Sequence, residues 1–142
     1  MSIRMTEKEF NKLMGNKTKN KKTVNKFHNK KIKVDGIVYD STKEYERHCY
    51  LKILEKAGDI SNLRFHKDSI TLIEDPLVKY IPDFCYIENG NNIVEDFKGM
   101  QTKEFILKKK MIISMIKKGS LKIVFRIVKY ENGNFVTIEE YK

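Results

Sequence analysis

Three two-residue turn signals, Asp35-Gly36, Asn89-Gly90 and Asn132-Gly133, limit how this chain can fold. Asn-Gly and Asp-Gly favour the positive φ angles that the tightest β-hairpin loops need, so each dipeptide predicts two antiparallel neighbouring strands. Between and around these turns the apolar residues favour extended structure. We therefore predict a hairpin over 31–40 and strands near 63–73, 78–88, 92–98, 121–129 and 134–141.

Helices are predicted at two places between these strands. Ser41 can cap a helix that ends at Gly58, and a second helix should run from about 102 to 118. The chain has no internal repeat, so we predict one α/β domain over 31–142 that follows a basic, partly flexible arm over 1–30. Three residues that recur at four-residue spacing also indicate the first helix: Tyr45, Cys49 and Ile53.

The net charge of +10 is unevenly distributed along the 142 residues. Residues 1–33 hold eleven basic side chains against two acidic ones, whereas 34–142 hold eighteen against seventeen. A concentrated basic excess predicts a polyanionic partner, because each neutralised phosphate releases condensed counterions. A lysine-rich tail that keeps the protein soluble explains the same pattern, so charge alone identifies no chemistry.

Nothing in the composition indicates secretion or membrane insertion. No apolar run approaches the roughly 20 residues that a membrane span needs, and the N-terminus lacks the apolar stretch of a signal peptide. The two cysteines, Cys49 and Cys85, have neither CxxC nor zinc-type spacing, and we expect reduced, mostly buried thiols. These features predict a cytoplasmic protein that has no membrane partner.

The segment that indicates chemistry lies around the Asn89-Gly90 turn. If that turn is a two-residue loop, Asp83 and Asp96 face each other directly across the hairpin, with side chains on the same face. Strand alternation places Lys98 on this face as well, two residues beyond Asp96. A loop one residue longer would break this pairing, so the loop length decides the prediction.

Two directly opposed aspartates repel each other and therefore need a compensating partner. Lys98 alone could fill this role, which would make the group a structural salt bridge. A hard cation such as Mg²⁺ is the other alternative, since it prefers carboxylate oxygens. A cation held beside a lysine can polarise a phosphodiester and orient a water for attack. The side chains of Glu95 and Phe97 should point to the opposite face of the hairpin.

Glu44 could supply a third carboxylate, because it lies in the first turn of the predicted helix after Ser41. The Ser-x-x-Glu spacing is also that of a capping box, which would give Glu44 a purely structural role. The histidines, His28, His48 and His66, show no zinc-ligand spacing. For each of them a surface or hydrogen-bonded role is favoured over a catalytic one, although His48 follows Glu44 by four residues and could border the site.

The order of these motifs resembles the PD-(D/E)XK nuclease superfamily. More closely, residues 25–128 are similar to a family of small phage- and prophage-encoded proteins within it. The resemblance implies a restriction-endonuclease-like core, in which helices flank a mixed central sheet in αβββαβ order. The elements predicted from Ser41 onward follow that order. The motifs are Asn25-Lys26-Phe27-His28, Val34-Asp35-Gly36, Tyr39-Asp40-Ser41 with Glu44, Pro82-Asp83-Phe84, and Glu95-Asp96-Phe97-Lys98-Gly99.

The resemblance also implies roles for individual residues. Asp83 and Asp96 would be ligands of Mg²⁺ or Mn²⁺, and Lys98 would position water and stabilise developing charge. Glu44 and the backbone carbonyl of Phe97 would complete the metal site. The resemblance thus implies a metal-dependent endonuclease that hydrolyses DNA phosphodiester bonds.

Contacts with DNA are expected from two places in the sequence. Gln101 and Thr102 follow the last motif and could reach the DNA backbone, although Thr102 could equally cap the following helix. The remaining candidates are basic residues of the arm and the start of the domain: Lys21, Lys22, Lys26, Lys30 and Lys31.

Phage proteins of this size and superfamily resemble Holliday-junction resolvases and branched-DNA endonucleases, which are commonly homodimers. We therefore expect branched DNA as the substrate, a homodimer, and the cytoplasm of a bacterial host as the compartment. Three alternatives stay open at this point. They are a restriction- or transposase-type nuclease, a catalytically silent DNA-binding module of the same fold, and a nuclease that acts on RNA.

Overall fold

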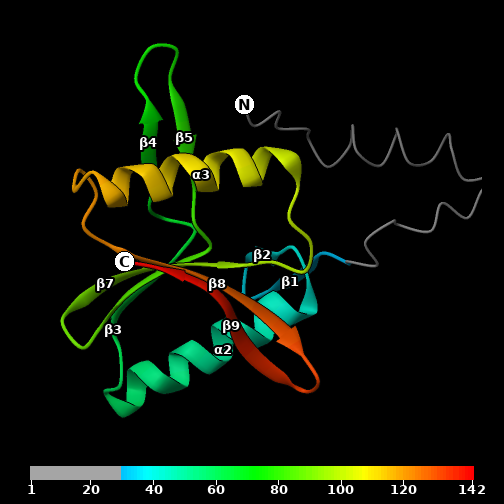
Figure 1. Ribbon diagram of the computed structural model, residues 1–142. Helices are drawn as coiled ribbons and strands as arrows, with labels where there is room; N and C mark the ends of the chain where they lie inside the picture. Colours follow the sequence, from blue (N-terminus) through cyan, green and yellow to red (C-terminus); the bar gives the residue numbers. More distant parts are fainter. Residues whose placement is uncertain (1–29) are drawn as a thin grey trace, which may run out of the picture.

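The computed structural model describes residues 30–142, which form two helices and nine strands (Figure 1). A five-stranded sheet in the order β3-β6-β7-β8-β9 is its centre. β7 and β8 are parallel, and the other neighbouring pairs are antiparallel. The predicted α/β class and mixed sheet are confirmed. The strands are β3 Ser61–Phe65, β6 Phe84–Glu88, β7 Asn91–Phe97, β8 Val124–Glu131 and β9 Asn134–Tyr141.

The two helices cover opposite faces of this sheet (Figure 1). Helix α2 spans Thr42–Ala57, with Ser41 as its N-cap and Gly58 in the left-handed conformation at its end (φ 84°). Helix α3 spans Lys103–Lys117, and its N-cap is Thr102. Both predicted helices and their caps are confirmed, because the capping side chains satisfy N–H groups that a helix leaves unpaired.

The buried face of α2 is not the one that carries Tyr45, Cys49 and Ile53. Tyr45 and Cys49 are only partly buried and Ile53 is 63% exposed, so this face lies at the edge of the packed surface. The face that packs against the sheet instead carries mostly polar side chains, namely Glu44, Arg47, His48 and Leu51. The four-residue spacing indicated the helix correctly, but it did not identify the face that packs against the sheet. Hydrophobicity alone cannot identify polar side chains that are buried because they have hydrogen-bond partners in the protein.

The hydrophobic core forms a layer on each face of the sheet. On the α2 face, the buried residues are Leu51, Ile60, Phe84, Tyr86, Ile93 and Val124. On the α3 face, they are Tyr80, Cys85, Val94, Phe105, Ile112, Phe125 and Ile127. Successive residues of β7 alternate between the two layers, as a strand buried on both sides requires.

Two small hairpins accompany the sheet. β1 (Ile32–Val34) and β2 (Ile37–Tyr39) pair around Asp35-Gly36, which confirms the predicted hairpin. β4 (Ile70–Ile73) and β5 (Val78–Tyr80) form the second hairpin, which extends on the α3 side of the sheet (Figure 1).

This second hairpin corrects the prediction of continuous strands over 63–73 and 78–88. The first strand ends at Phe65, because the φ of 54° at His66 lies in the left-handed region that ends extended structure. The second is interrupted over 81–83, where Pro82 has no N–H to donate to a strand ladder. The interruption leaves Asp83 immediately before β6, at the end of an inner strand of the sheet.

Three further predictions concern membrane spans, the cysteines and the N-terminal arm. None of the helices in residues 30–142 is long and apolar enough to cross a membrane. Within the same range both thiols are free, with Cys85 buried and Cys49 only partly buried. The predicted arm over 1–30 lies outside the described residues except for Lys30.

Candidate metal centre

The register of the β6–β7 hairpin decides which side chains meet. Glu88 pairs with Asn91, so the loop is Asn89-Gly90 alone, with positive φ angles of 51° and 79°. The predicted two-residue loop is confirmed. The last pair of the ladder is Phe84 with Glu95. The next opposed positions are therefore Asp83 and Asp96, as the sequence predicted.

Asp83 is buried immediately before β6 and holds two hydrogen bonds. Its Oδ2 accepts the backbone N–H of Phe97 at 2.8 Å, which fixes the carboxylate against β7. Its Oδ1 lies 2.9 Å from Nε2 of His66. Burial raises the pKa of Asp83, and the charge of Glu44 acts in the same direction. Asp83 thus lies between two other acids, with His66 as its hydrogen-bond partner and Lys98 nearby.

Asp96 is 2% exposed and lies on the α3 side of β7. Its Oδ2 accepts a hydrogen bond from the hydroxyl of Tyr80. Its Oδ1 is the one buried side-chain oxygen or nitrogen in residues 30–142 that has no hydrogen-bond partner. Lys98 Nζ is 3.5 Å from it, which permits attraction but not a good hydrogen bond. Burial and Asp83 raise the pKa of Asp96 well above its usual value.

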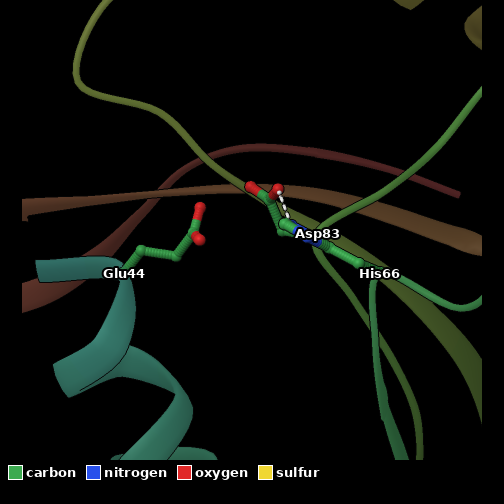
Figure 2. Close-up of side chains that lie close together, drawn as sticks. All are labelled: Glu44, His66 and Asp83. Atoms are coloured by element: carbon green, nitrogen blue, oxygen red, sulfur yellow. Dashed lines mark hydrogen bonds and ion pairs between the residues drawn. The ribbon is translucent and has the colours of Figure 1, made fainter. Parts of the chain in front are cut away.

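Glu44 combines the two roles that its sequence position left open. Its N–H donates to Ser41 Oγ at 3.1 Å, and its Oε1 accepts the N–H of Asp40 at 3.3 Å, so it belongs to the helix cap. The same side chain is 3% exposed and its carboxylate is directed toward Asp83 (Figure 2). Burial raises the pKa of Glu44. The cap therefore orients a carboxylate that remains available to the centre.

His66 is the residue of this cluster that the sequence did not indicate. It follows Phe65, which pairs with Phe84, and so it lies opposite Asp83. Ligand atoms of Glu44, His66 and Asp83 all lie within 4.8 Å of one another (Figure 2). The register between β3 and β6 was the missing signal, because a separate hairpin intervenes between these strands.

Lys98 lies just beyond β7, next to the acids. Its backbone N–H donates to the carbonyl of Val128 at 3.0 Å, which anchors the turn after the strand. Burial acts against the charged form, yet the pKa of Lys98 is raised because Asp96 and Asp83 stabilise its charge. Its ammonium also lies 4.8 Å from the centre of the Phe105 ring. Lys98 is therefore a cation at the edge of the carboxylate group.

Two residues predicted to contact DNA have partners within the protein. Thr102 accepts the N–H of Phe105 at 3.2 Å, so its predicted alternative role as a helix cap is confirmed. Gln101 donates to Glu139 at 2.6 Å and accepts from Lys109 at 2.7 Å, which holds it on β9 rather than leaving it free. Their DNA contacts remain predictions.

The other predicted contacts are only partly described. Lys30 and Lys31 are exposed at the start of the described chain. Lys21, Lys22 and Lys26 lie outside the described residues. The carbonyl of Phe97 stays a predicted ligand, while its N–H is used by Asp83.

His48 does not border the centre. It is buried in the core, where Tyr39 Oη lies 2.7 Å from its Nδ1 and its ring stacks on Phe65. Burial, together with the charges of Lys52 and His66, lowers the pKa of His48 to about 4. This histidine is therefore a neutral core residue, in agreement with the structural role favoured from the sequence.

The residues present fit a divalent cation. Two buried carboxylates and an imidazole are close enough to share one ion, and Oδ1 of Asp96 lacks a partner beside them. Carboxylate oxygens are the ligands that Mg²⁺ and Mn²⁺ prefer. An unpaired buried acceptor costs roughly 1–3 kcal/mol, and its presence next to Asp83 is accounted for if a ligand completes it.

Comparison with known proteins gives the family but no activity. No curated protein matches the chain. A family profile matches residues 24–132, which include the β1–β2 hairpin, both helices and every residue of the centre described above. The chain belongs to the family described as protein of unknown function DUF1064.

Proposed function

We propose that this protein is a metal-dependent endonuclease that hydrolyses DNA phosphodiester bonds. The observation that supports it most is the group of three buried acids, Glu44, Asp83 and Asp96, beside Lys98. Buried acids normally pair with cations or bind metals. Here burial raises the pKa of all three, and one carboxylate oxygen lacks a partner.

The order of elements supports a restriction-endonuclease-like core. Helix α2, strands β3, β6 and β7, helix α3 and strand β8 follow each other as αβββαβ when the β4–β5 hairpin is treated as an insertion. The parallel pair β7–β8 joins through α3, as a crossover between parallel strands requires. In this arrangement the acids come from α2, β6 and β7, which is the order of the motifs that resemble PD-(D/E)XK nucleases.

The side chains have distinct tasks in the proposed reaction. Glu44, Asp83 and Asp96 would hold Mg²⁺ or Mn²⁺, and Asp83 is kept in place by the N–H of Phe97. When bound, such an ion polarises the phosphate and lowers the pKa of a coordinated water. The ammonium of Lys98 stabilises negative charge that develops on the phosphate during attack. Its proximity to Asp96 keeps it charged at neutral pH.

The substrate and assembly belong to the same proposal. The basic excess over residues 1–33 favours a nucleic acid partner. The resemblance to resolvases favours branched DNA, a homodimer that cuts two strands, and the cytoplasm of a bacterial host for a phage- or prophage-encoded protein. A silent DNA-binding module of the same fold is the main alternative, but binding alone gives no reason to bury three acids together.

The test is a cleavage assay on defined nucleic acids. Purified protein is incubated with linear, supercoiled, flapped and four-way DNA and with single-stranded RNA, in Mg²⁺, Mn²⁺ or EDTA. We expect cleavage of DNA with either metal, most rapid on branched substrates, and none in EDTA. Binding without cleavage under every condition would favour the silent module, and cleavage of RNA alone would assign a different substrate.

A further inference from the structure

His66 is held in a fixed position beside the acids. Its backbone N–H donates to the carbonyl of Asp83 at 3.0 Å. Its ring stacks on Phe65, with 3.8 Å between the ring centres and 20° between their planes. The backbone bond fixes the position of the residue, and the stacking on Phe65 orients its ring, so that Nε2 faces Asp83 (Figure 2).

The spacing of the donor atoms matches that of ligands around one ion. His66 Nε2 and Asp83 Oδ1 are 2.9 Å apart. Two adjacent ligands of an octahedral ion, each about 2.0–2.1 Å from it, are separated by roughly 2.9 Å. Glu44 completes the group within 4.8 Å. A cation could therefore replace the hydrogen bond between His66 and Asp83 with little movement of either side chain.

A second observation points to a ligand next to Asp83. Oδ1 of Asp96, in a side chain that is almost fully buried, has no hydrogen-bond partner. Asp96 lies opposite Asp83 in the hairpin register, and the two carboxyl groups are close enough to affect each other's pKa, lowering that of Asp83 and raising that of Asp96. The acceptor that lacks a partner and the imidazole thus lie on either side of Asp83.

We propose that His66 is a direct ligand of the metal and gives the centre a preference for Mn²⁺ or a later transition ion over Mg²⁺. The inference rests on the proposed function only in assuming that these acids bind a cation. Mg²⁺ prefers oxygen ligands and retains several waters, whereas imidazole nitrogen favours transition ions, for which affinity rises from Mn²⁺ onward. His66 is thus predicted to change the choice of ion as well as its affinity.

The test measures metal binding to the full-length protein without DNA. Mn²⁺ and Mg²⁺ affinities are determined by calorimetry, and the Mn²⁺ complex is studied by pulsed electron paramagnetic resonance. We expect a ¹⁴N coupling from one imidazole. In His66→Gln this coupling should be lost, Mn²⁺ affinity should fall at least about 10-fold, and Mg²⁺ affinity should change by much less. His66→Asn is a second variant, and His28→Gln is a control that removes a histidine but retains His66.

The outcomes separate this inference from the proposed function. Bound Mn²⁺ without an imidazole coupling, a coupling that persists in both His66 variants, or equal losses of Mn²⁺ and Mg²⁺ affinity would overturn the ligand role, whether or not DNA is cleaved. An imidazole coupling that depends on His66 would support it even if no nucleic acid were cleaved. Failure of wild-type protein to bind any divalent ion would overturn both proposals.

Discussion

Glu95 and Asp96 are neighbours on β7, yet their buried carboxylates have opposite surroundings, because alternate residues of a strand point to opposite faces. On the α2 face, Glu95 accepts two hydrogen bonds from Arg47, at 2.8 and 2.7 Å, and one from the hydroxyl of Tyr86 at 2.7 Å. On the α3 face, Asp96 has one oxygen bonded to Tyr80 and one without a hydrogen bond.

Both oxygens of Glu95 therefore have hydrogen-bond donors within the folded protein, whereas one oxygen of Asp96 has none. A bidentate ion pair with a guanidinium is among the strongest ways to compensate the charge of a buried carboxylate. Asp96 has instead a second acid opposite it and a lysine at 3.5 Å, and burial together with Asp83 raises its pKa. Substitution on the first face should therefore affect stability, and substitution on the second should affect metal binding and catalysis.

The largest expected effect on stability comes from Glu95→Gln. Removing this charge leaves Arg47 buried without its counterion, which should lower the free energy of unfolding by about 3–5 kcal/mol. The matched variant Asp96→Asn replaces an acid whose charged form is disfavoured by burial, so stability at pH 7 should be unchanged or higher. Urea denaturation of the two variants measures both effects. Equal destabilisation would mean that the two acids have the same structural role.

Lys98→Ala should slow DNA cleavage by about 1,000-fold, since it removes a cation that stabilises charge developing in the transition state. Asp96 and Asp83 stabilise this ammonium, so the melting temperature should also fall, and cleavage is compared well below the melting temperature of the variant. Single-turnover cleavage and thermal denaturation measure the two properties. Lys108→Ala is the control, because Lys108 contacts Glu104 and the carbonyl of Lys79 outside the centre. An equal loss of cleavage in Lys98→Ala and Lys108→Ala would contradict a specific role of Lys98 in the reaction.

The α2 face should also make stability depend on pH through His48. Its pKa is lowered from 6.5 to about 4 in the folded protein, so the unfolded chain binds more protons between these values. The free energy of unfolding should therefore fall by roughly 2–3 kcal/mol as pH decreases from 6.5 to 4. His48→Asn should lack this contribution, while the acids of the centre act equally in both proteins. Parallel stability curves for wild type and variant would contradict the assignment.

Glu44→Gln tests a residue that the structure assigns to the cap and directs toward the centre. Glutamine can still accept the N–H of Asp40, so the melting temperature should remain almost unchanged. Loss of the carboxylate should reduce cleavage by about 10- to 100-fold, in the range found when groups around a metal are altered. Full activity in this variant would restrict the centre to residues of the sheet.

The local parts of this structure could be predicted from the sequence. Asn89-Gly90 determines a two-residue loop, and that loop aligns Asp83 with Asp96 through the register of one hairpin. Ser41 and Gly58 likewise determine the ends of α2 by hydrogen bonds within a few residues. In both cases the interactions that decide the structure lie close together along the chain.

The parts that could not be predicted depend on contacts between distant segments. His66 and Asp83 meet because β3 pairs with β6 across an intervening hairpin, and no local pattern determines that register. The polar face of α2 was missed for the same reason, since Arg47 and Glu95 are 48 residues apart and compensate each other only after folding. The role of a charged residue inside a protein depends on its partner.

The measurement that tests the central claim most directly compares wild-type protein with Asp83→Asn in single-turnover cleavage of branched DNA, with DNA binding measured in the same samples. The account predicts cleavage by the wild type that requires Mg²⁺ or Mn²⁺, and none by the variant. It also predicts that the variant binds DNA as well or better, because repulsion between a carboxylate and phosphate is removed. Cleavage that persists in EDTA, or an Asp83→Asn variant that cleaves like the wild type, would contradict the account.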